Sequence, residues 1–191
     1  MAEERAERRL AAILAADVAG YSRLMEKDEE RTHAAFLLCR AAIAQIIADR
    51  HGRIFGGAGD SVMAEFASPV EAVRAGVEIQ KRVAGHALDL PAGLQMPFRI
   101  GINLGDVMAD RGELFGDGID IAARLQATAE PVGICLSGSV HEQIAGKVSL
   151  MLKDLGLCEM KNVDGQRVRR PSTKISTRCR TLRCQPGWSC M

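Results

Sequence analysis

Aromatic residues are scarce in this 191-residue sequence: they make up 4% of it, as one Trp, one Tyr and five Phe. Proteins that bind single-stranded nucleic acid stack the bases on aromatic side chains, so this composition argues against such a binder. The formal net charge of +1 gives no global attraction to nucleic acid or anionic lipid either. A nucleic-acid partner is therefore not expected.

The sequence also lacks a long apolar run, because no stretch approaches the ~20 residues that a membrane helix requires. The apolar run at residues 10–16 is followed at once by Asp17, and the N-terminus carries acidic residues where a secretory signal has basic ones. These features predict a cytoplasmic protein with no membrane partner. The six cysteines show no CxxC spacing, which argues against a zinc site.

What the sequence contains is the pattern of a globular domain, with 47% hydrophobic and 26% charged residues. A continuous apolar run at residues 10–18 predicts a buried central strand. Residues 53–66 read as strand, turn and strand. Further strands are expected at residues 98–103 and 106–109 (two strands or one bent strand), at 133–136, and within 150–163.

Helices alternate with these strands. Asp28 is a candidate N-cap of a helix that stops at Gly52, and its apolar positions are Ala34, Leu37, Leu38, Ala41, Ile43, Ile46 and Ile47. The sequence SPVE at residues 68–71 combines a capping-box pattern with proline at the first helical position, and so begins a second helix. Further helices are expected at residues 116–129 and after Ser137 or Ser139. This alternation predicts an α/β fold of the α+β sandwich type, in which helices cover a mixed sheet.

The periodic pattern ends near residue 166. The segment 171–191 has basic residues but no acidic ones, which predicts a disordered basic tail over residues 166–191. A nucleic-acid-binding arm is the alternative for this tail. The expected organisation is an N-terminal extension at residues 1–7, a domain at residues 8–165, and the tail.

The glycine-rich turn RIFGGAGDSVMAEF at residues 53–66 matches neither common phosphate-binding loop. Gly59 is followed by Asp60 and not by the lysine of a P-loop, and Val62 stands where GxGxxG has its third glycine. Asp17 and Asp60 remain, each at the end of an apolar strand, where a charge must be solvated or paired. They are either turn-forming residues or a carboxylate pair that holds Mg²⁺ or Mn²⁺.

Several blocks of the sequence resemble class III adenylate and guanylate cyclases, most closely the bacterial soluble-cyclase branch. The blocks keep the order of that family over roughly residues 8–165, and this collinearity is more specific than any single motif. The blocks are AADVAGYS (15–22) and GDSVMAEF (59–66), similar to the two metal-binding signatures, FRIGINLGDV (98–107), similar to the central hairpin, FGDGIDIAARL (115–125), similar to the dimer-arm helix, and GICLSGSV (133–140) and EMKNV (159–163).

The resemblance implies a ferredoxin-like βαββαβ core with a mixed, mainly antiparallel sheet. It also implies cyclisation of a nucleoside triphosphate, in which the ribose 3′-oxygen attacks the α-phosphorus in line and pyrophosphate leaves. Two ions of Mg²⁺ or Mn²⁺ would be held by Asp17, Asp60 and the backbone carbonyl of Val18. Arg124 would stabilise charge on the α-phosphoryl group, and Lys161 would bind the terminal phosphates. The family places the metal carboxylates and these two cations on different subunits, which predicts a homodimer with its sites at the interface.

Three positions differ from the family pattern. Gly56 stands where adenylate cyclases have a purine-binding lysine, Glu113 where they have an aspartate that accepts from the adenine amino group, and Asp120 where they have a ribose-orienting asparagine. Glu113 keeps the acceptor, so ATP is the expected substrate and GTP the alternative. The sequence thus predicts an adenylate cyclase in cyclic-nucleotide signalling. Gly56 and Asp120 also fit a degenerate cyclase-fold module that binds nucleotide or regulates a partner cyclase.

Overall fold

A computed structural model describes residues 7–84, 88, 90–91, 94–110, 112–148, 150, 153–154 and 173–176. In chain order the elements are β1 (Glu7–Val18), α1 (Tyr21–Lys27), α2 (Glu29–Asp49), β2 (Arg53–Gly56), β3 (Val62–Phe66), α3 (Pro69–Ala84), β4 (Phe98–Asp110), β5 (Glu113–Phe115), α4 (Asp117–Thr128), β6 (Gly133–Leu136), α5 (Gly138–Ile144), β7 (Lys153–Asp154) and β8 (Thr173–Ser176).

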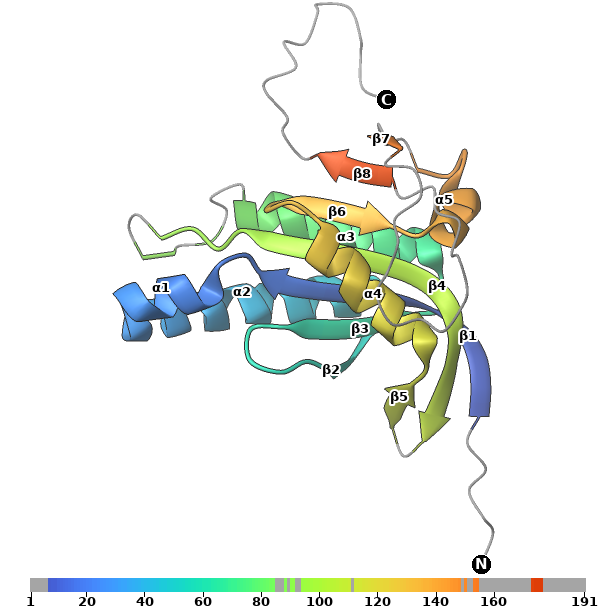
Figure 1. The fold of residues 1–191 in the computed structure, drawn as a ribbon, viewed down its shortest axis with the longest axis horizontal. Coiled ribbons are helices and arrows are strands. Elements are labelled where there is room, and N and C mark those ends of the chain that lie inside the picture. Colours follow the sequence, from blue (N-terminus) through green and yellow to red (C-terminus); the bar gives the residue numbers. More distant parts are fainter. Residues whose placement is uncertain are drawn as a thin grey trace, which may run out of the picture.

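The strands form one sheet of order β2-β3-β1-β4-β6-β8-β7, with β5 paired to β4 beside this path. Strands β4 and β6 are parallel, and the other described pairs are antiparallel. Helices α2 and α3 cover one face of the sheet and α4 crosses the other (Figure 1). The predicted α+β sandwich with a mixed, mainly antiparallel sheet is therefore confirmed.

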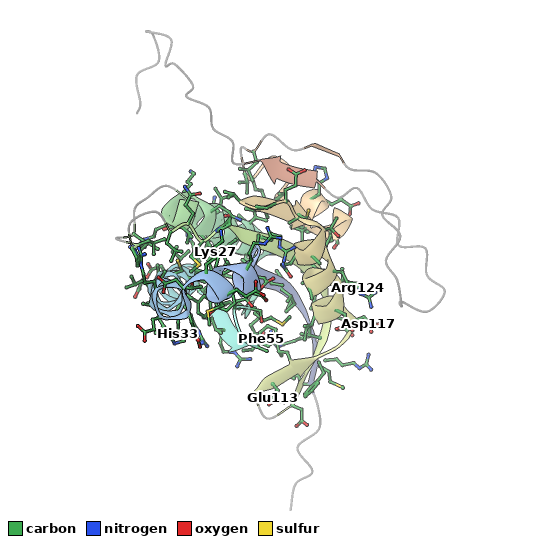
Figure 2. The ribbon with its side chains drawn as sticks, turned by 60° about the vertical axis from the view of Figure 1, so that its left-hand side comes forward. Lys27, His33, Phe55, Glu113, Asp117 and Arg124 are labelled. Carbon is green, nitrogen blue, oxygen red and sulfur yellow. The ribbon has the colours of Figure 1, made fainter. Side chains whose placement is uncertain are left out.

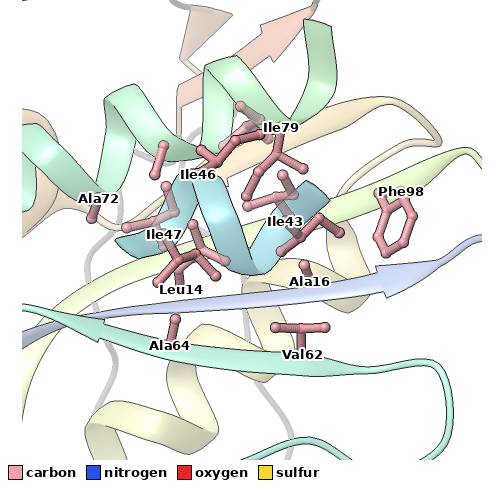
Figure 3. Packing of buried hydrophobic residues seen from close by; sticks show 14 of the residues in the cluster. Leu14, Ala16, Ile43, Ile46, Ile47, Val62, Ala64, Ala72, Ile79 and Phe98 are labelled. Carbon is pink, nitrogen blue, oxygen red and sulfur yellow. The ribbon is translucent and has the colours of Figure 1, made fainter. Parts of the chain in front are cut away.

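Strand β1 is the central strand that its apolar run predicts, and it is buried on both faces from Ala11 onward, although Leu10, the first residue of that run, is 65% exposed. Its residues alternate between two cores, as the two-residue period of a strand requires. Leu14 and Ala16 belong to the main core with α2 and α3 (Figure 3), and Ile13 and Ala15 face the α4 side. A strand covered on both sides has no polar face, which explains why the sequence shows a continuous apolar run here.

Helix α2 begins as predicted, because the Asp28 carboxylate accepts a hydrogen bond from the Arg31 amide at 3.1 Å. The predicted buried stripe is wrong in part, since Leu37 and Leu38 are 50% and 47% exposed. In the first half of the helix, Ala35, Phe36 and Cys39 turn inward in place of the predicted positions, whereas the predicted Ile43, Ile46 and Ile47 are buried. The buried residues of α2 are Thr32, Ala35, Phe36, Cys39, Ile43, Ile46 and Ile47.

By length and composition alone, α2 could also cross a membrane, with 21 residues and a window of mean hydropathy 1.2. The sequence predicts no apolar run of this length, and α2 differs from that prediction. The inner face of α2 packs in the main core against β1, β3 and α3 (Figure 3). A core helix satisfies the same test, and the packing accounts for its apolar character.

The other two predicted caps are also present. The Glu71 amide at the start of α3 donates to the Ser68 hydroxyl at 3.4 Å, and the Val140 amide at the start of α5 donates to the Ser137 hydroxyl at 3.4 Å. Strand β4 runs unbroken over residues 98–110, so the single-strand reading of that segment is confirmed.

Two differences concern the C-terminal part. Of the strands expected within residues 150–163, the described part contains Lys153–Asp154. Thr173–Ser176 forms β8, although the sequence places it in a disordered tail. The reason is that β6 has a free edge beyond β4, and β8 pairs with it antiparallel over four residues. Such pairing depends on a partner distant in sequence, which local periodicity does not reveal. The rest of the predicted tail lies outside the described residues.

Candidate functional site

Asp17 is placed by the register of the two central strands. It is the next-to-last residue of β1 and lies directly opposite Arg99 of β4. The Arg99 guanidinium donates to Asp17 Oδ2 at 3.0 Å, and the Gln126 side-chain amide of α4 lies 3.4 Å from the same oxygen. Asp17 is thus a partly buried carboxylate held from β4 on one side and from α4 on the other.

Asp60 is placed by the glycine-rich turn between β2 and β3. Gly57 and Gly59 adopt positive φ angles of 136° and 63°, which disfavour a side chain. A Cβ at Gly57 would also lie 2.3 Å from the Ser61 carbonyl oxygen. The Ser61 hydroxyl closes the turn on the backbone of Ala58 at 2.8 Å. The glycines therefore shape a turn that carries Asp60.

The turn brings Asp60 to the end of β1. The backbone amide of Val18 donates to Asp60 Oδ2 at 3.3 Å. Asp17, Val18 and Asp60 line one pocket of about 500 Å³, together with Arg99, Gly20, Tyr21, Ser22, Arg23 and Glu26. The structure thus brings together all three of the predicted metal-site residues.

The pKa of Asp60 is shifted by its surroundings. Burial, followed by hydrogen bonding and charge from the neighbouring Asp17, raises the pKa of Asp60 from 3.8 to about 6. Burial, with the charges of Asp60 and Glu29, also raises the pKa of Tyr21 at the pocket rim. A site with excess negative charge and oxygen donors is suited to a divalent cation.

We expect the crowded carboxylate to make metal-free stability depend on pH. A carboxyl whose folded pKa is raised binds its proton more tightly in the folded state, so its contribution to stability falls as pH rises from about 4 to about 6. Asp60→Asn cannot ionise and should gain stability relative to the unmutated protein over this range. Urea unfolding in EDTA at pH 4, 5, 6 and 7 measures the difference. A difference that is constant with pH would contradict the expectation.

The remaining predicted residues lie elsewhere. Gly56 ends β2, Glu113 is exposed on β5, Asp120 is exposed on α4, and Arg124 is partly buried on the same helix. Arg124 and Glu113 lie on the α4 side of the sheet, across from α2 with its His33 (Figure 2). None of these four lines the Asp17–Asp60 pocket. Lys161 lies outside the described residues.

Sequence reasoning missed two residues that contact Asp17. Arg99 could have been found by aligning β1 antiparallel to β4, since the register that pairs Ala16 with Ile100 pairs Asp17 with Arg99. Gln126 has no comparable signal, because its contact depends on how closely α4 packs on β4. That packing requires Gly101, where a Cβ would lie 2.2 Å from the backbone nitrogen of Gln126.

A solved structure called an adenylate/guanylate cyclase/hydrolase, from Silicibacter pomeroyi, is 41% identical to this chain, with a TM-score of 0.79 over 90% of this chain and 98% of that one. The chain belongs to the class III adenylate/guanylate cyclase family. The adenylyl cyclase CyaB from P. aeruginosa shares the cyclase fold at 22% identity, with a TM-score of 0.71 over 89% of this chain and 94% of that one.

Among curated relatives of this cyclase domain, a Rhizobium meliloti protein named "Putative adenylate cyclase 3" is 42% identical over 165 residues. The match covers 86% of this chain and 28% of the Rhizobium protein, so the chain spans less than a third of that relative. No family model matches the chain. In this cyclase domain the central strand β1 carries Asp17, and the glycine-rich turn between β2 and β3 carries Asp60 to the same pocket.

Proposed function

We propose that the chain is an adenylate cyclase catalytic domain, which converts ATP to 3′,5′-cyclic AMP and pyrophosphate in cyclic-nucleotide signalling. The observation that carries the proposal is the placement of Asp17 and Asp60 in one pocket, at the positions of the two cyclase signatures. The 41% identity to the Silicibacter protein and the name of the Rhizobium relative support this activity.

The donor set fits Mg²⁺ or Mn²⁺. Asp17 and Asp60 offer hard oxygen ligands, and the pKa of Asp60 is raised first by burial and then by Asp17, whose negative charge a cation would neutralise. The backbone carbonyl of Val18 is the third proposed ligand. When bound, the two ions would supply activation of the ribose 3′-oxygen and neutralisation of the phosphates. Arg99 already lies against Asp17 and balances part of the charge before any ion binds.

The cationic residues of the site are proposed to come from a second copy of the chain. Arg124 would stabilise charge on the α-phosphoryl group, Lys161 would bind the terminal phosphates, and Asp120 would orient the ribose by accepting from it. The position of Arg124 outside the Asp17–Asp60 pocket supports this division. A homodimer would then hold two sites, each built from both subunits.

The base pocket is proposed to lie at Gly56 and Glu113, with ATP preferred because Glu113 accepts from the adenine amino group. Related cyclase domains have been solved with either kind of nucleotide: a rhodopsin-guanylyl cyclase core with converted specificity in complex with ATPαS, and the guanylate cyclase domain of RhGC from Catenaria anguillulae in complex with GTP. GTP is therefore the competing substrate to test.

The decisive experiment incubates the purified chain with Mn²⁺ and either ATP or GTP, in parallel and at high protein concentration. Cyclic AMP should form from ATP faster than cyclic GTP forms from GTP. Absence of product from both nucleotides would refute the enzyme, and faster formation of cyclic GTP would refute the choice of substrate.

A second candidate function is a degenerate cyclase-fold module that binds nucleotide or regulates a partner cyclase. Gly56 favours this candidate, because glycine has no side chain that could donate to the base. The position has room for one, since a Cβ at Gly56 would have no atom within 4 Å. Loss of one donor to a base costs about 1–3 kcal/mol in discrimination, which weakens selectivity more than phosphoryl transfer. The module would bind nucleotide in the experiment above without forming product.

We expect Gly56→Lys to raise the preference for ATP. The open space at Gly56 accommodates the longer side chain, and its ammonium group adds a donor for the base. The ratio of kcat/KM for ATP to that for GTP should rise by about tenfold, from one added hydrogen bond of a charged donor. Gly56→Ala is the matched control and should leave the ratio unchanged. An unchanged ratio in Gly56→Lys would show that the base binds elsewhere.

A further inference from the structure

Glu65 is a charged side chain buried within the sheet. It lies on β3 opposite Ile13 of β1, on the same face as α4, and its side chain is 9% exposed. An apolar residue would satisfy the alternation of this strand, and a buried carboxylate is costly unless it is paired. The charge at this position therefore calls for an explanation beyond the fold.

Two arginines from neighbouring strands neutralise Glu65. Arg9 of β1 forms an ion pair with Glu65 Oε2, and Arg53 of β2 donates from Nε to Glu65 Oε1 at 2.6 Å. Both oxygens of the carboxylate are thus engaged. The guanidinium of Arg53, which is half exposed, is held in one orientation by a rigid acceptor.

Arg53 also contacts a residue outside strands β1, β2 and β3. Its Nη1 donates to the backbone carbonyl of Gly112 at 3.0 Å, in the turn between β4 and β5. Gly112 directly precedes Glu113, and Arg53 stands three residues before Gly56. The Arg53 side chain therefore connects β2, which ends at Gly56, to the turn that immediately precedes Glu113.

The β4–β5 hairpin has little else to fix it. Strand β5 pairs with β4 over three residues, and in the part of the chain that the structure describes no strand pairs with its other side. Leu114 is buried in a small apolar cluster that Phe55 of β2 also contacts, while Glu113 and Phe115 are exposed. Figure 2 shows Phe55 and Glu113 on this side of the sheet. The Arg53 contact adds a polar link between β2 and the turn before β5.

We propose that Arg53, oriented by Glu65, is a positioning residue for the base-binding pocket. Its hydrogen bond to Gly112 holds the β4–β5 turn against β2 and so sets the distance between Gly56 and Glu113. This distance determines how well the Glu113 carboxylate can accept a hydrogen bond from the purine. The inference rests on the proposed function, in which these two residues bind the base. Arg53 itself does not touch the substrate.

Arg53→Gln tests this role, with Arg53→Lys as a second variant that keeps the charge beside Glu65 but cannot reach both acceptors. Arg50→Gln is the matched control, because Arg50 also bridges two acceptors, Glu71 and Glu78, but on the α2–α3 side. Hydrogen exchange of the amides of residues 113–115 reports on the hairpin without any requirement for catalysis. Initial rates with ATP and GTP give kcat and KM.

In both Arg53 variants we expect about tenfold faster exchange at residues 113–115, since a local opening no longer breaks the Arg53 contact. The KM for ATP should rise by about three- to tenfold, with kcat within about twofold of the unmutated value. The ATP/GTP ratio should fall. Arg50→Gln should change none of these quantities.

Two results would overturn the proposal: exchange at residues 113–115 that equals that of Arg50→Gln, or a loosened hairpin with unchanged KM and ATP/GTP ratio. If the unmutated chain forms no cyclic nucleotide, the proposed function fails, and calorimetric affinity for ATP replaces KM in the same comparison. Weaker ATP binding in Arg53→Gln then supports the positioning role without the enzyme. Equal binding, or no binding by the unmutated chain, overturns it.

Discussion

Asp17→Ala is expected to lower cyclic-nucleotide formation by about a thousandfold or more, because loss of a metal carboxylate removes charge stabilisation that the reaction needs throughout. Asp60→Ala should do the same. Asp49→Ala is the control, since Asp49 is an exposed carboxylate whose contact is a hydrogen bond from Gln45. The rate of cyclic AMP formation with Mn²⁺ is the measurement, and circular dichroism should show that each variant remains folded.

The same variants test the division of the site between subunits. Asp17→Ala and Arg124→Ala should each be inactive alone, yet co-expression should restore about a quarter of the activity. Half of randomly paired dimers are mixed, and one of the two sites in a mixed dimer has both residues intact. Co-expression of Asp17→Ala with Asp60→Ala should restore nothing, because both residues belong to the same half-site.

Retention of more than a tenth of the activity by Asp17→Ala would remove this residue from the site. Failure of the Asp17→Ala and Arg124→Ala pair to recover, with both proteins folded and dimeric, would place Arg124 in the same half-site as Asp17 or outside the site.

Gly101→Ala is expected to destabilise the fold by about 3 kcal/mol, at the upper end of what overpacking costs. The added Cβ would lie 2.2 Å from the Gln126 nitrogen and 2.3 Å from the Ala122 carbonyl oxygen, both in the backbone of α4. Backbone atoms cannot rotate away as a side-chain tip can, so α4 must lift from β4. Urea unfolding should show a lower midpoint.

Gly56→Ala provides the comparison, because its Cβ would have no neighbour within 4 Å. Its unfolding free energy should stay within about 0.5 kcal/mol of the unmutated value. A similarly small effect of Gly101→Ala would mean that α4 lies farther from β4 than the structure shows.

Much of the fold could be predicted because local signals agreed with the tertiary structure. The apolar run of β1, the cap at Asp28 and the Ser68 pattern each specify an element within a few residues of chain. The same holds for the candidate site, where Asp17 and Asp60 stand out as charges at the ends of apolar strands. Collinear cyclase motifs then bring the two together, although Arg124 and Lys161 rest on resemblance alone.

The features that could not be predicted depend on contacts between distant segments. The register of β1 and β4 places Arg99 opposite Asp17. Strand β8 forms because it pairs with the edge of β6. Glu65 gives no sequence signal, because a strand pattern with one charge reads as a solvent-facing position. In α2 the pattern predicts the buried Ile43, Ile46 and Ile47 correctly, but in the first half of the helix the buried side depends on where the sheet lies, and Leu37 and Leu38 face outward.

The order of the sheet has a consequence for aggregation. A long unpaired strand at the margin of a sheet is a template for uncontrolled pairing between molecules, and natural proteins guard against it with short or charged margins. Here one margin is the two-residue Lys153–Asp154, and the other is the four-residue β2, which begins with Arg53 and ends in glycine. Strand β8 pairs with the edge of the apolar strand β6, so that this edge is not available for pairing with another molecule. Stacking of further molecules strand by strand is thereby disfavoured at these two margins.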